Sequence, residues 1–240
     1  WILGRVENRM AKAHPALTFR RDKRARTTTF AEGCSPYKIA LLFIIGALLG
    51  DITETIFCRI TAGYWMSRSS LVWGPFSIVW GLAIALVTVL LYRYKDKSTS
   101  WLFVVGTVLG GAYEYLCSVA SEVVFGAVFW DYSHIPFNLG GRINLLYCFF
   151  WGFAAVAWFK VFYPPISRWI EKIPRNFGRV LTWVLCIFMV VDMAVSAMAL
   201  IRYNARIEGV PAQNQVEIYL DEHFDDARMQ KVYPKAVHVG

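Results

Sequence analysis

The sequence predicts an all-α integral membrane protein with about five transmembrane helices. Hydrophobic residues make up 57% of the 240 positions, and the mean hydropathy is +0.42. Soluble domains contain only about 45–50% apolar residues. Apolar runs of roughly 20 residues, long enough to cross a bilayer as a helix, also recur along the chain. We therefore expect a multi-pass protein of the cytoplasmic membrane, with the lipid bilayer as its principal partner.

The apolar runs divide the chain into three expected regions. A basic cytoplasmic segment covers residues 1–36, a transmembrane helical domain covers residues 37–204, and an extracytoplasmic tail covers residues 205–240. Spans within the domain are expected at residues 37–60, 76–94, 101–125, 144–162 and 180–201. In the tail, Val216, Leu220 and Phe224 share one helical stripe, which predicts a short helix over the outer face.

The positions of lysine and arginine predict the orientation of the helices. The net charge is +8, and basic residues cluster before the first span, between the second and third spans, and between the fourth and fifth. Because cytoplasmic loops are rich in lysine and arginine, these segments are expected on the cytoplasmic side. Such charge fits anionic lipid better than nucleic acid. Near the same face, Ile166, Trp169, Ile170 and Ile173 are spaced as one side of an amphipathic helix.

Two apolar stretches, at residues 46–54 and 106–114, share the pattern Gly-x-x-x-Gly-x-x-x-Glu. Each is followed by a polar, aromatic loop and then by a Trp-Gly pair, at Trp80 and at Trp151. We therefore predict a parallel two-helix internal repeat, with units at residues 37–94 and 101–162, plus one extra helix at residues 180–201. Glycines four residues apart let helix backbones approach in lipid, so the first and third spans are expected to cross at these glycines.

The carboxylates that end these patterns, Glu54 and Glu114, are expected to point into the helix bundle rather than toward lipid. A charge at that depth needs a partner, a proton or water. Two interpretations remain: a neutral acid in an interhelical hydrogen bond, or an outward-facing polar cavity. Arg142 is the expected counter-ion for Glu114 or Glu122, or for an anionic ligand. The full set of expected substrate-binding residues is Asp51, Glu54, Glu114, Glu122, Asp131, Tyr132, Asn138 and Arg142.

Other motifs limit the chemistry of the chain. The five cysteines form no CxxC motif and have no Cys/His metal spacing, so neither a metal site nor a cofactor is expected. The sequence contains no G-x-x-x-x-G-K-[ST] phosphate loop, so the chain is not expected to be an ATPase itself. No catalytic residue is identified by a motif.

The second repeat unit resembles a known bacterial family. Its segments YEYLCSVASEVVF, FWDYSHIPFNLGGRINL and FFWG are similar to the pattern of the CmpB-like family, ABC-transporter type IV. The first unit matches more loosely, because its segment GPFSIVWG lacks the cysteine and the second proline of the family pattern. The resemblance covers about residues 39–162. It implies an integral membrane protein of the permease type.

Three functions are compatible with these residues. The favoured one is transport of a small polar or anionic solute through an outward-facing carboxylate/arginine cavity. A separate energy-coupling subunit or a homo-oligomer would complete such a transporter. The first alternative is a membrane-embedded enzyme for a lipid or lipid-linked substrate, with Glu54, Glu114 or Asp131 as general acid or base. The second is a non-catalytic membrane scaffold or sensor.

Overall fold

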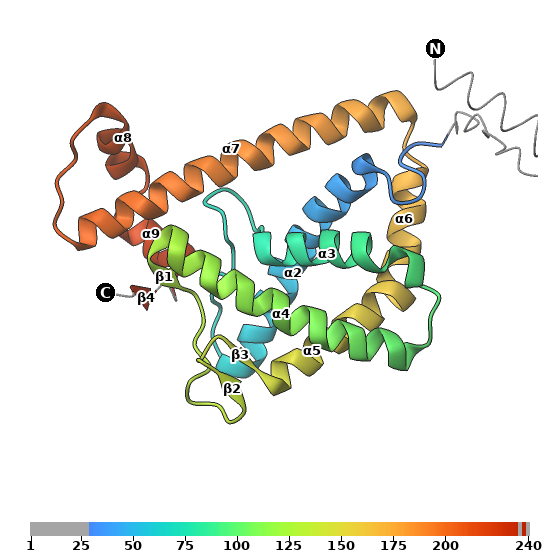
Figure 1. The fold of residues 1–240 in the computed structure, drawn as a ribbon. Coiled ribbons are helices and arrows are strands. Elements are labelled where there is room, and N and C mark those ends of the chain that lie inside the picture. The colour runs from blue at the N-terminus through green and yellow to red at the C-terminus, as the bar shows by residue number, and fades with distance from the viewer. Residues whose placement is uncertain (1–28, 235–236, 239–240) are drawn as a thin grey trace, which may run out of the picture.

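The computed structural model describes residues 29–234 and 237–238, and these residues are mostly helical (Figure 1). Four helices are long and apolar enough to cross a membrane: α2 (Pro36–Ala62), α4 (Thr99–Phe125), the continuous helix Leu145–Glu171, and α7 (Arg175–Ile207). The described strands form two short antiparallel pairs. The chain is therefore an all-α membrane protein. Most of the expected basic segment, residues 1–28, lies outside the described residues.

The expected second span corresponds to a shorter apolar helix, which consists of α3 (Ile78–Leu91) and η2 (Tyr92–Tyr94). At 1.5 Å per residue this helix is about 25 Å long, less than the ~30 Å hydrocarbon core of a bilayer. The reason is the preceding loop, which enters the bundle instead of staying at its end. Leu71 of that loop packs against Ile44 and Met189, and the Ser77 N–H donates to the Ala47 carbonyl over 3.0 Å.

Polar caps and glycines set the limits of the membrane helices. A side chain before each of α2, α3, α4 and α5 (Leu145–Ala157) accepts a hydrogen bond from a backbone N–H of the first turn. These N-caps are Ser35, Ser77, Ser98 and Asn144. At the other end, α2 and α4 end at Gly63 and Gly126, whose φ values of 81° and 61° favour glycine.

The third long helix changes direction along its length. After α5, a π-helical segment, η3 (Trp158–Phe162), leads into α6 (Tyr163–Glu171), which turns away from α5 in Figure 1. The π segment and the two prolines at the start of α6 explain the bend. The predicted amphipathic stripe lies here. Ile166 and Ile170 are buried in the main core, whereas Trp169 is 68% exposed, so part of the stripe packs on protein.

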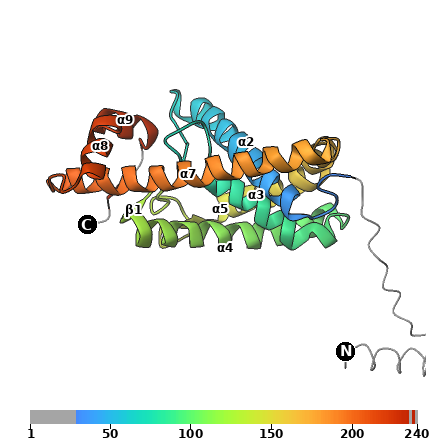
Figure 2. The same cartoon turned by 90° about the horizontal axis from the view of Figure 1, so that it is seen from above.

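The long helix α7 runs along the bundle and carries the C-terminal tail at one end (Figures 1 and 2). The tail forms two short helices, α8 (Gln215–His223) and α9 (Asp226–Val232), where the sequence predicted one. Leu220 and Phe224 of the predicted stripe are buried, but Val216 is exposed. Strand β4 (Val237–His238) then pairs antiparallel with β1 (Ala127–Val128), which follows α4. The tail therefore covers the end of the bundle where α4 finishes.

The expected crossing of the first and third spans at their glycines is wrong. A Cβ added at Gly50 would lie 2.1 Å from the Cβ of Trp80, and one added at Gly110 would lie 2.2 Å from the Cβ of Trp151. Each glycine row therefore faces the helix that follows it in the chain. The pattern indicates close approach of a second helix, as predicted, but the neighbours come from the following helix: Trp80 at Gly50, Trp151 at Gly110, Ile84 at Gly46 and Ala155 at Gly106.

Candidate functional site

Glu54 of α2 lies between the following loop and the following helix. The Trp80 indole N–H donates to Glu54 Oε2 over 3.0 Å, and the Arg68 Nε–H donates to Glu54 Oε1 over 2.7 Å. The second nitrogen contact of Arg68 is with the same carboxylate oxygen. Gly50 makes this arrangement possible, because the absence of a side chain lets Trp80 sit against the α2 backbone one turn before Glu54. Glu54 is thus held by an indole and by a guanidinium.

Glu114 of α4 has the corresponding position in the second helix pair. The Trp151 indole N–H donates to Glu114 Oε2 over 2.9 Å, and the Tyr132 hydroxyl donates to Glu114 Oε1 over 2.8 Å. Gly110 again lies under the tryptophan. Glu114 is 7% exposed. The difference from Glu54 is chemical, because both donors to Glu114 are neutral whereas Glu54 has a cationic partner.

The two helix pairs share further contacts at matched positions. A Cβ at Gly81 would meet the Phe43 carbonyl and ring, and a Cβ at Gly152 would meet the Phe103 carbonyl and ring. The Trp80 and Trp151 rings also meet each other, with their centroids 5.1 Å apart. The indoles that hold the two glutamates are therefore in contact, and this contact joins the two halves of the site.

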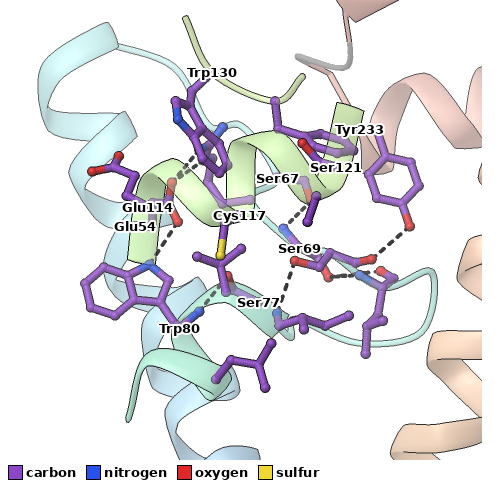
Figure 3. A pocket seen from close by; sticks show the side chains of 18 of the residues that line it. Glu54, Ser67, Ser69, Ser77, Trp80, Glu114, Cys117, Ser121, Trp130 and Tyr233 are labelled. Atoms are coloured by element: carbon purple, nitrogen blue, oxygen red, sulfur yellow. Dashed lines mark hydrogen bonds and ion pairs between the residues drawn. The ribbon is translucent and has the colours of Figure 1, made fainter. Parts of the chain in front are cut away.

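A cavity of about 810 Å³ lies beside these glutamates. It is lined by α2, α3, α4, α5 and α7, by the loops after α2 and α4, and by the tail. Figure 3 shows Glu54, Glu114 and Trp80 near one end and Tyr233 near the other. Most of the lining is apolar, from the side chains of Phe57, Leu71, Leu82, Val124, Phe125, Phe129, Phe150, Met193, Leu200 and Val232. The loop after α2, residues 63–77, is called the first loop below. Its serine side chains add a polar patch to the lining.

Of the eight site residues that the sequence predicted, three line this cavity. They are Glu54, Glu114 and Tyr132. The other five are not among the lining residues: Asp51, Glu122, Asp131, Asn138 and Arg142. Asp51 is buried in α2, and its Oδ1 has no hydrogen-bond partner within the described part of the chain.

Arg142 is paired with Glu122, one of its two expected acidic partners. Its guanidinium contacts the Glu122 carboxylate and donates to Ser118 Oγ over 3.1 Å. The Arg142 carbonyl accepts from the Trp130 indole N–H over 2.9 Å. These contacts attach the loop after α4, residues 126–144 and called the second loop below, to the side of α4. Arg142 is therefore paired with Glu122 rather than with Glu114.

Asp131 and Asn138 stabilise the second loop itself. Both carboxylate oxygens of Asp131 accept hydrogen bonds from Ser133, one from the backbone N–H and one from the hydroxyl, at 2.8 and 2.9 Å. These bonds hold the pKa of the Asp131 carboxyl below its usual value. Asn138 donates to the Ser133 and Ile135 carbonyls and accepts from the Gly141 N–H. At Gly141, φ is 69° and a Cβ would meet Asp131 Oδ1 at 2.6 Å.

Sequence reasoning missed Asp192 and Ser196 of α7, which hold the first loop inside the bundle. Asp192 Oδ1 accepts from the Trp73 N–H over 3.3 Å, and Ser196 Oγ accepts from the Val72 N–H over 2.9 Å. Loop backbone that enters a helix bundle needs such partners, because a buried N–H group without an acceptor costs free energy. The signal in the sequence was an aspartate in the middle of the otherwise apolar fifth run.

The sequence also missed Arg68 as the partner of Glu54, although Arg68 lies in the loop between the first two spans. The two tryptophans were noted only as part of a Trp-Gly repeat. Among the described residues, no group of three or more His, Cys, Asp or Glu side chains could hold a metal ion.

The fold and the cavity define a class of protein: a multi-pass helical membrane protein with a partly open cavity between its helices, loops and tail. The chain belongs to the family described as Putative ABC-transporter type IV, whose model matches residues 41–197. No curated protein and no solved structure matches the chain.

Proposed function

We propose that this chain is the membrane-embedded, solute-binding component of a transporter, and that the cavity is its solute site. The observation that supports this most is the shared position of Glu54 and Glu114. Each of the two helix pairs delivers one glutamate to the same cavity, through the same Gly–Trp contact. The family description points in the same direction.

The matched contacts support an internal duplication of the helix pair. The units are α2 with α3, and α4 with α5, and α7 is the additional helix. In transporters built from repeats, the substrate site lies between the units and the units rock about it. Such rocking would occur at the contacts between the two units beside the cavity, which include the Trp80–Trp151 ring pair and the hydrogen bond from the Tyr113 hydroxyl to the Val79 carbonyl.

Orientation and energy supply follow from the charge distribution and the motifs. The end that carries α8, α9 and the loop after α4 would face outward, since the basic loops lie at the other end. Energy would come from a separate subunit or from an ion gradient, because these 240 residues contain no phosphate loop. A homo-oligomer is a second way to complete the transporter.

The site residues in this proposal are Glu54, Glu114, Tyr132, Trp80 and Trp151. Glu122, Arg142, Asp131 and Asn138 would serve the second loop instead, because their hydrogen bonds are made within that loop or to the side of α4. Asp51 stays outside the proposed solute site.

Access to the cavity from both faces of the membrane tests the proposal. Ser121 lines the cavity, so Ser121→Cys in a variant without the five native cysteines gives a reporter thiol. Membrane-impermeant thiol reagents are added to right-side-out and to inverted vesicles. A transporter predicts labelling from both sides, with the ratio changing when the energy source is supplied.

The control is Val123→Cys on the same helix, where the side chain is 79% exposed and outside the lining. We expect slow labelling of this lipid-facing thiol from either side. Labelling of Ser121→Cys from the outer face alone, under every condition, would contradict transport and favour the enzyme or the scaffold.

A further inference from the structure

The charge and lining of the cavity allow its ligand class to be narrowed, on the assumption that the cavity is the solute site proposed above. Among the described lining residues, the charged side chains are Glu54, Glu114 and Arg68. Arg68 is bonded to Glu54. We propose that the cavity takes an amphiphilic cation, that is, a solute with one positive charge and an apolar body.

Glu114 provides the negative charge that such a solute would meet. Its two oxygens accept from the Tyr132 hydroxyl and the Trp151 indole, which are neutral donors. Hydrogen bonds from neutral donors orient a carboxylate, but they do not cancel its charge. A carboxylate that is 7% exposed therefore calls for a positive partner or a proton. A bound cation supplies that partner.

Aromatic faces beside the glutamates fit the same ligand. The Trp80 and Trp151 rings lie 5.1 Å apart between centroids, and the Tyr132 and Tyr147 rings stack at 4.6 Å. All four line the cavity. The faces of such rings attract cations, most strongly where water is excluded. A cation at Glu114 would thus gain from its aromatic neighbours as well as from the carboxylate.

The size and the apolar walls of the cavity fit the body of the solute. The volume of about 810 Å³ falls within the range of roughly 300–1,000 Å³ that accommodates drug-sized molecules. Leucine, valine and phenylalanine side chains of α3, α4 and α5 contribute to the apolar wall, together with apolar side chains of α2, α7, the two loops and the tail. A small, fully hydrated ion would leave these walls without a partner.

The sequence favoured a small polar or anionic solute, and an anionic one loses its expected counter-ion here. That expectation depended on Arg142, which is paired with Glu122 outside the lining. The cavity arginine, Arg68, is already bonded to Glu54. An anion placed here would meet two carboxylates and one occupied guanidinium.

Two ions of nearly the same size and shape but opposite charge test the proposal. Tetraphenylphosphonium is the cation and tetraphenylborate is the anion. Binding of each is measured by equilibrium dialysis to the full chain in nanodiscs of phosphatidylcholine, with empty nanodiscs subtracting partition into lipid. We expect saturable binding of the phosphonium and none of the borate. Saturable borate binding of equal affinity, or no saturable phosphonium binding, would overturn the cation assignment.

Three cavity variants test whether the charge count sets the affinity. Glu114→Gln and Glu54→Gln each bring the sum of the three charges to zero, so each should weaken phosphonium binding at least about tenfold. Arg68→Gln leaves both carboxylates without the guanidinium, so it should tighten binding. A variant that merely disturbs the fold would not improve affinity, so the opposite sign separates the charge effect from misfolding.

Glu122→Gln is the matched control, since it removes a carboxylate from α4 outside the lining. Its phosphonium affinity should stay within about twofold of the parent. Equal affinities for the parent, Glu114→Gln and Arg68→Gln would overturn the proposal. Two-sided labelling of Ser121→Cys remains an independent result: if it succeeds while phosphonium binding fails, transport stands and the solute class is wrong.

Discussion

The first helix pair, α2 with α3, and the second, α4 with α5, make the same helix contacts but connect their helices differently. In both pairs a glycine lies under a tryptophan, and the indole bonds a glutamate one turn further on. Both loops make hydrogen bonds within themselves. The first loop enters the bundle and also bonds to α7, whereas the second also bonds to the side of α4. The helix contacts therefore set the position of each glutamate, and the loops determine which charged or neutral partners surround it.

The largest loss of stability is expected when the glycine–tryptophan contact of either helix pair is disturbed. Replacing Gly50 or Gly110 with Leu puts atoms into the space that Trp80 or Trp151 occupies, where even a Cβ would lie 2.1 or 2.2 Å away. Because overpacking typically costs about 1–3 kcal/mol and here the neighbour is packed on backbone, we expect a loss of at least that size. Thermal unfolding in detergent measures it, with the lipid-facing Val108→Leu as control.

The two glycine variants should behave alike, since the helix contact is common to both pairs. If Gly50→Leu unfolds far below the parent while Gly110→Leu unfolds at the parental temperature, the two contacts are not equivalent. The glycine–tryptophan contact would then stabilise only the first helix pair.

The next largest effect is a difference between the two loops in the side chains that stabilise them. Asp192→Ala removes the acceptor for the Trp73 N–H, so we expect a loss of about 1–3 kcal/mol and rapid hydrogen exchange in residues 69–77. Asp192→Asn keeps an acceptor oxygen and should lose less. Asp131→Ala should speed exchange in residues 131–142 alone. Faster exchange in the second loop after Asp192→Ala would show that α7 supports both loops.

A smaller effect is the difference in stability expected between the variants of the two indole partners. Trp80→Phe leaves Glu54 with Arg68, but Trp151→Phe leaves Glu114 with only the Tyr132 hydroxyl. A hydrogen bond to a charged group contributes about 1.5–3 kcal/mol, so Trp151→Phe should be the more destabilising of the two. Chemical unfolding of both variants, each compared with the parent, gives the order. The reverse order would mean that Arg68 does not compensate for the lost indole.

The smallest effect concerns the tail, which contacts both loops. Its attachment includes Asp221, which accepts from the Arg202 guanidinium at 2.8 and 2.9 Å. Hydrogen bonds from Arg202 lower the pKa of the Asp221 carboxyl. A lowered folded-state pKa gives stability that is present above the unfolded value, about 3.9, and lost as the pH falls through the folded value.

We therefore expect hydrogen exchange in α8 and α9 to be constant from neutral pH to about pH 4 and to rise below it, after correction for the intrinsic rate. Asp221→Asn should show raised exchange at neutral pH and little further change in acid. An acid response in Asp221→Asn equal to that of the parent would assign the effect to another carboxyl group.

The sequence predicted the membrane class, the family resemblance and the positions of the long apolar helices, because these depend on local composition and motifs. It could not identify the partner of each glycine row, since a small-residue pattern specifies close approach but not the neighbour. Arg68 and Asp192 were missed for a related reason. Their partners, Glu54 and the Trp73 N–H, lie 14 and 119 positions away, and no periodic pattern connects them.

In the second loop, the sequence interpretation assigned too many polar residues to the substrate site. Its WDYS and GRI segments are conspicuous, and the sequence interpretation placed Asp131, Asn138 and Arg142 in the substrate site. The structure shows bonds that build the loop, with Asp131 bonded to Ser133 and Arg142 to Glu122. Polar residues of distinctive type can therefore serve loop geometry, and only their partners separate that role from binding.

Glu54 and Glu114, one from each helix pair, share one cavity, and their indole partners meet. A structure of the full chain determined in lipid nanodiscs tests this arrangement most directly. We expect the Trp80 and Trp151 rings in contact, each indole N–H donating to its own glutamate, and both carboxylates facing the same space. Glu54 and Glu114 opening into separate spaces, with the two tryptophans apart in every conformation, would contradict it.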